Sequence, residues 1–127
     1  MSIHIKRLAN VIIPVKDQEA ALKFYTEKLG FKKRADMPFG PGLRWIEVAP
    51  DEVETAIAIC PPGPSGAVGG KDTGITLETE DVNALHSQLK NQGVDVDAEI
   101  AHFGDDVPPM FWFRDTENNT LSVVEAR

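Results

Sequence analysis

The sequence predicts an α+β fold made of two tandem βαβββ modules, and two observations predict it. The first is an internal repeat: an aspartate that can begin a helix recurs at Asp17 and Asp81, and a glycine that can end the helix recurs at Gly30 and Gly93. The second is the order of patterns, because one strand-like run precedes each helix-like stretch and three follow it. This order excludes a simple alternating α/β fold. We expect each helix to cover one face of a sheet, and a functional site to lie where the two modules face each other.

The first module is expected over about residues 7–60. A β-branched apolar run at 8–15 predicts a buried strand, and Asp17 is placed to cap the helix that follows. Apolar residues at spacings of three and four give that helix one apolar face, and Gly30 can end it. The three later strands, separated by glycine- and proline-rich turns, are expected at 31–36, 43–49 and 54–60.

Residues 61–72 are rich in proline and glycine and are expected to form a linker. The second module, about residues 73–127, then repeats the order. We expect a strand at 74–79, a helix at 81–92, and strands at 94–100, 110–114 and 120–124. The whole chain, 1–127, is the length of one domain.

Composition narrows the classes of partner. The chain has 13 Lys and Arg against 20 Asp and Glu, a net charge of −7, which argues against nucleic acid. Its single cysteine, Cys60, cannot form an internal disulfide, so we expect a cytoplasmic protein. No apolar run approaches the ~20 residues of a membrane span. The first residues lack the pattern of a signal peptide, and we expect them to lead into a strand.

Alternation along four of the strands separates two kinds of face. In three of them the large aliphatic side chains fall on one side and small or polar side chains on the other. The aliphatic side is expected under the helix, and the other side is typical of a cavity wall. The candidate ligand-binding residues on that other side are Asn10, Ile12, Ala58, Cys60, Gly74, Thr76 and Ser122.

Two motifs give the chain a resemblance to a known family. Val15-Lys16-Asp17 leads into the first helix and Leu29-Gly30-Phe31, and Phe113-Arg114-Asp115 precedes the last strand. With the repeat, this resembles the vicinal oxygen chelate superfamily, which includes glyoxalase I, bleomycin-resistance proteins and extradiol dioxygenases. The closing motif departs from the family pattern, since this chain has Asp115-Thr116-Glu117-Asn118-Asn119. The resemblance implies two tandem βαβββ modules whose curled mixed sheets enclose a pocket, a homodimer, and sites within one chain or across two.

The resemblance also implies where a metal would be held. Metal-dependent members place ligands on the first, fourth, fifth and eighth strands, which correspond here to Asn10, Ala58, Gly74 and Ser122. Alanine and glycine side chains offer no donor, and transition metals need several imidazole, thiolate or carboxylate ligands. We therefore expect neither a metal nor another cofactor.

Further candidates lie on two strands and one loop. Trp45 and Glu47 share one side of their strand and Arg44 lies on the other, so either set can face the pocket, where Trp45 would be a stacking wall and Glu47 a polar anchor. On the seventh strand, Trp112 can likewise either line the pocket or pack under the helix. His102 lies in a polar loop and, with Glu47, is a weak candidate for acid-base chemistry. Cys60 fits a small buried residue better than a nucleophile.

Two functions follow from these patterns. The first is a metal-independent protein that binds a compact, partly planar small molecule in the cavity between the modules. The alternative is a glyoxalase-like lyase or dioxygenase-type enzyme that either retains a metal at a non-standard site, through unfamiliar groups such as His102, Glu47 or Asp105, or runs acid-base chemistry without a metal.

Overall fold

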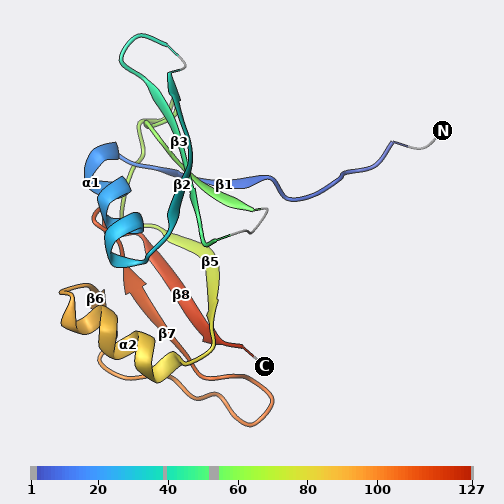
Figure 1. Cartoon of the computed structure of the whole chain (residues 1–127), viewed down its shortest axis with the longest axis vertical. Helices are drawn as coiled ribbons and strands as arrows, with labels where there is room; N and C mark the ends of the chain where they lie inside the picture. The colour runs from blue at the N-terminus through green and yellow to red at the C-terminus, as the bar shows by residue number, and fades with distance from the viewer. Residues whose placement is uncertain (1–2, 39, 52–54, 127) are drawn as a thin grey trace. The chain divides into compact units, whose positions relative to one another are not determined.

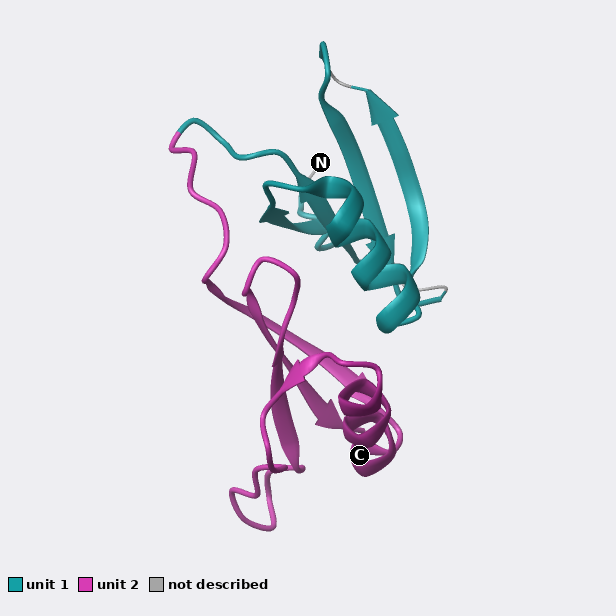
Figure 2. Cartoon of the chain, turned by 90° about the vertical axis from the view of Figure 1, so that its left-hand side faces the viewer, with its two compact units in different colours: residues 1–64 teal, residues 65–127 magenta. Residues whose placement is uncertain are grey.

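The computed structural model describes residues 3–38, 40–51 and 55–126. The chain divides into two compact units, Met1–Pro64 and Ser65–Arg127, which are coloured separately in Figure 2. Each unit contains helical structure and one four-stranded sheet, which is the α+β architecture that the sequence predicts. The curling of the sheets around a shared pocket stays a prediction.

Unit 1 follows the predicted order of one strand, one helix and three strands (Figure 1). Its sheet has the order β1-β4-β3-β2, in which β1 is parallel to β4 and the other pairs are antiparallel. The elements are β1 (Asn10–Pro14), α1 (Gln18–Lys23), a π-helical turn η1 (Phe24–Lys28), β2 (Lys32–Pro38), β3 (Arg44–Ala49) and β4 (Ala56–Cys60).

The first helix begins and ends where its sequence requires. Asp17 Oδ1 accepts a hydrogen bond of 3.0 Å from the backbone N–H of Ala20, which satisfies one of the free donors of the first turn. The last five residues widen into η1, and both Phe24 and Tyr25 are buried there. Gly30 has a positive φ of 74°, as the predicted end of the helix requires.

Unit 2 repeats this arrangement around its own core. Its sheet has the order β5-β8-β7-β6, with β5 parallel to β8 and the other pairs antiparallel. Asp81 caps α2 by accepting 3.0 Å from the backbone N–H of Ala84, as Asp17 does in unit 1. The elements are β5 (Asp72–Thr79), α2 (Val82–Asn91), β6 (Asp95–Val96), β7 (Met110–Arg114) and β8 (Thr120–Glu125).

The aliphatic faces form the cores, as the alternation predicts. Of the aliphatic residues in that alternation, Ile13, Ile59, Leu121 and Val123 are at most 2% exposed, whereas Ile75 and Leu77 are partly buried. Because side chains alternate in direction along a strand, every second side chain points to the sheet face that does not pack against the helix. In the described part of the chain, no helix has the length and apolar character needed to cross a membrane.

Some strand limits differ from the prediction, most of all in β6. The strand predicted at 94–100 is reduced to two residues, because the chain then leaves the ladder and rejoins β7 through a single bridge between Ala101 and Met110. β2 runs on to Pro38, where it pairs with Arg44, and β5 begins at Asp72. The start of the strand predicted at 54–60 lies outside the described residues, and β4 begins at Ala56.

Candidate functional site

The contacts of α1 show which face of the first sheet is free of helix. Gln18 Nε2 donates to the backbone oxygens of Arg44 (2.7 Å) and Ile59 (2.9 Å), so the helix begins over β3 and β4. The Arg44 guanidinium also pairs with Glu19 of α1, which places the Arg44 side chain on the helix side.

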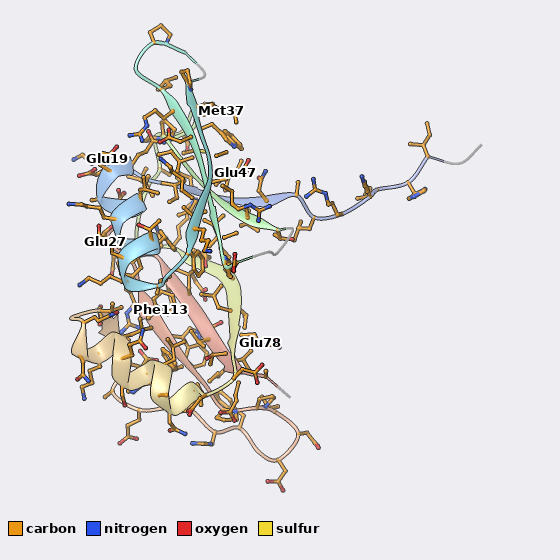
Figure 3. The ribbon with its side chains drawn as sticks, in the orientation of Figure 1. Glu19, Glu27, Met37, Glu47, Glu78 and Phe113 are labelled. Carbon is orange, nitrogen blue, oxygen red and sulfur yellow. The ribbon has the colours of Figure 1, made fainter. Side chains whose placement is uncertain are left out.

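Because side chains alternate along a strand, Trp45 and Glu47 lie on the other side. Figure 3 shows Glu19 on the helix and Glu47 away from it. We call this the helix-distal face of unit 1.

The helix-distal face of unit 1 is organised around Trp45 and Glu47. The indole Nε1 of Trp45 donates a hydrogen bond of 2.7 Å to Glu47 Oε2, which fixes the two side chains together. Glu47 is directly opposite Ala58 in the ladder, and Ala58 is opposite Ile12. Strand residues that face each other across a ladder share a sheet face, so all four side chains lie on this one.

Small buried residues form the floor of this face and large apolar residues form its exposed part. Ala58 is completely buried, whereas Ile12 is 53% exposed and Met37, opposite Trp45, is 50% exposed. By alternation from Ile12 and Ala58, the predicted residues Asn10 and Cys60 lie on the same face. The six sequence-predicted residues of unit 1 are therefore brought together.

Cys60 is enclosed and electrostatically disfavoured as a nucleophile. It is 6% exposed, and burial, followed by the negative charge of Glu47, raises the pKa of its thiol. The thiol form is therefore favoured at neutral pH, in agreement with the reading of Cys60 as a small buried strand residue.

The second sheet has a matching helix-distal face, which carries Trp112. The ring of His86 on α2 packs edge-on against Phe111 at 5.0 Å, so Phe111 lies toward the helix and Trp112 away from it. Trp112 is opposite Ser122, and Ser122 is opposite Thr76. The hydroxyl oxygens of Thr76 and Ser122 lie 2.9 Å apart and form a hydrogen bond. This surface, the helix-distal face of unit 2, thus joins an aromatic ring to a pair of hydroxyls.

Phe103 adds a second aromatic ring that sequence reasoning did not single out. Its ring lies edge-on to Trp112 with centroids 6.3 Å apart, and the residue is 60% exposed. The signal available in the sequence was an isolated aromatic residue in a polar loop, next to Gly104. The neighbouring His102 is exposed, and its role in acid-base chemistry stays a prediction.

The strand position of Gly74 is irregular. The register between β5 and β8 shifts between Asp72 and Thr76, and Gly74 has a φ of 71°, a conformation that residues with a Cβ rarely adopt. Asp72 Oδ1 accepts 3.1 Å from the Gly74 N–H and so supports this bend. A glycine is therefore required here by the backbone, at a position where the family resemblance implies a ligand.

Arg114 forms an ion-pair cluster at the edge of the second sheet. Its guanidinium donates to Asp95 (2.9 Å) and to Asp97 (2.7 Å), and the hydrogen bond from Arg114 lowers the pKa of Asp95. Arg44 makes the equivalent contacts to Asp36 and Glu19 in unit 1. Among the residues that the structure describes, no three His, Cys, Asp or Glu side chains gather as metal ligands would.

Comparisons with known proteins agree on one family. A model of the Glyoxalase/Bleomycin resistance protein/Dioxygenase superfamily matches residues 5–123. The uncharacterized protein YetH of Bacillus subtilis (strain 168) is 37% identical over 91 residues, 72% of this chain and 76% of YetH.

Two solved structures are similar over nearly the whole chain. A member of the same superfamily from Sphaerobacter thermophilus is 32% identical, with a TM-score of 0.88 over 96% of this chain and 98% of that one. TnmS3, described as an antibiotic binding protein from Streptomyces sp. CB03234, is 30% identical, with a TM-score of 0.85 over 99% and 100%.

Proposed function

Because the chain belongs to the Glyoxalase/Bleomycin resistance protein/Dioxygenase superfamily, we propose that it binds a compact, partly planar small molecule without a metal. The observation that carries this proposal is the composition of the two helix-distal faces. Each presents a tryptophan beside a polar anchor, Trp45 with Glu47 in unit 1 and Trp112 with the Thr76–Ser122 pair in unit 2. Apolar and aromatic walls with a few placed polar groups are typical of small-molecule sites.

The polar groups suit hydrogen bonding to a ligand. Glu47 accepts the indole N–H with one carboxylate oxygen, and its other oxygen is an acceptor for a hydroxyl or amine of a ligand. Ser122 Oγ can donate to the backbone oxygen of Ile75 at 3.3 Å, in which case Thr76 donates to Ser122 and keeps acceptor capacity. Both faces thus combine a stacking ring with a hydrogen-bond acceptor.

Metal independence is supported by the chemistry of the residues at the implied ligand positions. The four residues are Asn10, Ala58, Gly74 and Ser122, of which two have no donor atom in the side chain. Ser122 already shares its hydroxyl with Thr76 and Ile75. Transition-metal sites are built from imidazole, thiolate and carboxylate donors, and these positions supply none of them.

A thermal-unfolding screen of chelator-treated protein tests this proposal. The probes are a panel of aromatic antibiotics, chosen because TnmS3 is described as an antibiotic binding protein, and the chlorides of zinc, nickel, iron(II) and manganese. A ligand at ~100 times its dissociation constant adds about 2.7 kcal/mol to the free energy of unfolding. This addition raises the midpoint temperature of unfolding by a measurable amount. We expect stabilisation by an aromatic compound alone. Stabilisation by a metal alone would contradict the proposal.

The two tryptophans also allow the site to be located. They are the only ones in the chain, and each lies on one helix-distal face, so intrinsic fluorescence reports on the proposed site directly. We expect a ligand found in the screen to quench the fluorescence, and Trp45→Phe and Trp112→Phe to assign the quenching to one face or both. Binding that leaves both emissions unchanged argues for a site elsewhere.

A further inference from the structure

Glu47 places a negative charge in the middle of an apolar and aromatic surface. Its strand, β3, lies between β2 and β4, and the residues opposite it in the two ladders are Ala35 and Ala58. Trp45 and Ile12 lie on the same face, and Glu47 itself is half-buried there. Figure 3 shows Glu47 on the side of the sheet away from the helix. A charge in apolar surroundings is disfavoured unless an opposite charge compensates it.

No cation compensates Glu47 through an ion pair in the described part of the chain. The ion pairs of unit 1 use the carboxylates of Glu19, Asp36 and Asp51, and Glu47 takes part in none of them. Its hydrogen-bond donor is the indole N–H of Trp45, at 2.7 Å. A neutral donor orients the carboxylate but leaves its full negative charge on the face.

A planar ligand on this face changes the solvation of Glu47. A ring that stacks on Trp45 also removes water from Glu47, because the two side chains are hydrogen-bonded to each other. A neutral ring leaves the carboxylate desolvated and uncompensated, and an anionic ligand adds repulsion. A protonated amine instead donates a charge-assisted hydrogen bond to the carboxylate and is attracted by the indole ring. The charge of the ligand is therefore the property that this face distinguishes most strongly.

The corresponding face of unit 2 has a different polar group beside its tryptophan. The groups next to Trp112 are the hydroxyls of Thr76 and Ser122, which carry no charge. Arg114, two residues along the strand, is already paired with aspartates. Glu78 is exposed and lies two residues beyond Thr76. The duplicated fold thus places its charged anchor beside the tryptophan of unit 1.

We propose that the small molecule is a planar aromatic amine in its protonated form, and that Glu47 selects it by charge. The ring stacks on Trp45, and the ammonium group donates to Glu47. Because Glu47 Oε2 accepts the indole N–H, Oε1 is the acceptor for the ligand. The net charge of −7 adds a long-range attraction for cations. This inference rests on the proposed small-molecule function and narrows it to one class of ligand.

Three naphthalene derivatives of similar shape test the proposal by calorimetric titration of the full chain. They are naphthylmethylamine, which is protonated at neutral pH, naphthalenemethanol, which is neutral, and naphthylacetate, which is negatively charged. We expect the amine to bind about tenfold or more tightly than the alcohol, and the acetate to bind most weakly. Equal affinities for the amine and the alcohol would overturn the proposal.

Substitutions assign this preference to one carboxylate. Glu47→Gln keeps an acceptor for the indole and removes the charge, so it is expected to bring the affinities for the amine and the alcohol together. The matched control Glu27→Gln removes a carboxylate from η1 and is expected to leave the preference unchanged, as is Glu78→Gln on β5. A preference that survives in Glu47→Gln, or is lost in Glu78→Gln, would overturn the proposal.

The aromatic antibiotics of the thermal-unfolding screen separate this inference from the proposed function. We expect the stabilising compounds to be cations at neutral pH, and Glu47→Gln to reduce their stabilisation. Stabilisation by neutral or anionic compounds alone would overturn the inference and leave the proposed function standing. A panel in which no aromatic compound stabilises the chain would contradict the proposed function and this inference with it.

Discussion

At the scale of single residues, Glu47 has two effects on the helix-distal face of unit 1. It accepts the hydrogen bond of the Trp45 indole at 2.7 Å, and its charge contributes to the raised pKa of Cys60. Glutamine at position 47 would retain an acceptor for the indole and remove the charge. The two effects can therefore be separated by one substitution.

We expect Glu47→Gln to make Cys60 more reactive. Removal of the carboxylate lowers the pKa of the thiol, so more thiolate forms at a given pH, while burial of Cys60 still slows the reaction. Alkylation by iodoacetamide at pH 8 is expected to accelerate about two- to threefold. Glu27→Gln, which removes a charge from the exposed side of η1, is the control. Equal rates in the wild type and in Glu47→Gln would show that the charge of Glu47 does not reach Cys60.

A substitution at Phe103 separates the contribution of this ring to ligand binding from its contribution to stability. Because Phe103 is 60% exposed, we expect Phe103→Ala to change the free energy of unfolding by less than about 0.5 kcal/mol. We expect it to weaken by several-fold any ligand that quenches Trp112, since an aromatic pair is worth about 0.5–1.5 kcal/mol. Val107→Ala, in the same loop, is the matched control. Calorimetric titration checks the affinity, and unchanged affinity would remove Phe103 from the site.

Some of the site could be predicted at this scale, because the spacing of Trp45 and Glu47 alone places them on one side of a strand. Which side they occupy depends on the contacts that Gln18 and Glu19 make with Arg44, which lies 26 and 25 residues away from them in the sequence. The position of Phe103 against Trp112 depends on the path of a loop. Periodicity carries no information about either contact.

At the scale of elements, each helix begins with the same aspartate cap. We expect Asp17→Ala and Asp81→Ala to lower the free energy of unfolding by about 1 kcal/mol each, since each removes the acceptor of a first-turn N–H. Asp105→Ala, in an exposed loop, is the control. Urea unfolding followed by circular dichroism checks this, and a cost no larger than that of the control would show that the caps contribute nothing.

The ion pair between Asp95 and Arg114 should make stability depend on pH. The hydrogen bond from Arg114 lowers the pKa of Asp95 from its ordinary 3.8. The stabilisation is therefore complete above this ordinary value, which applies to the unfolded chain, and is lost as the pH falls through the folded value. Asp95→Asn is expected to cost less than about 1 kcal/mol at pH 7, because the Asp95 side chain is mostly exposed.

That cost is expected to be smaller at a pH well below the ordinary 3.8, because the folded chain loses the charge of Asp95 as the pH falls through its lowered pKa. Urea unfolding of wild type and variant at the two pH values measures it, with Asp105→Asn as the control. A cost that does not fall at the lower pH would show that Asp95 acts through packing and not through its charge.

The elements also show where prediction from sequence fails. The helix starts at Asp17 and Asp81 and the ends at Gly30 and Gly93 are local features, and the structure confirms them. The strand predicted at 94–100 is wrong beyond Val96, because the ladder with β7 is interrupted before Ala101. The interruption depends on strand pairing and not on the apolar pattern of the segment.

At the scale of the whole molecule, the internal repeat predicts the fold and the family. Two sheets of corresponding strand order, β1-β4-β3-β2 and β5-β8-β7-β6, follow from a duplicated βαβββ sequence. The repeat does not extend to charge, since most carboxylates lie in unit 2. The repeat does not determine the chemistry of the site either. The implied metal positions hold Asn10 and Ala58 in the first half and Gly74 and Ser122 in the second.

The central claim is that the chain binds a planar small molecule without a metal. Equilibrium dialysis of the chelator-treated protein against an aromatic compound from the screen, with elemental analysis of the same samples, tests it most directly. We predict saturable binding with one dissociation constant in the presence and absence of added zinc, nickel, iron(II) or manganese, and only substoichiometric metal. Binding that appears only after a metal is restored, at one metal per site, would contradict the account.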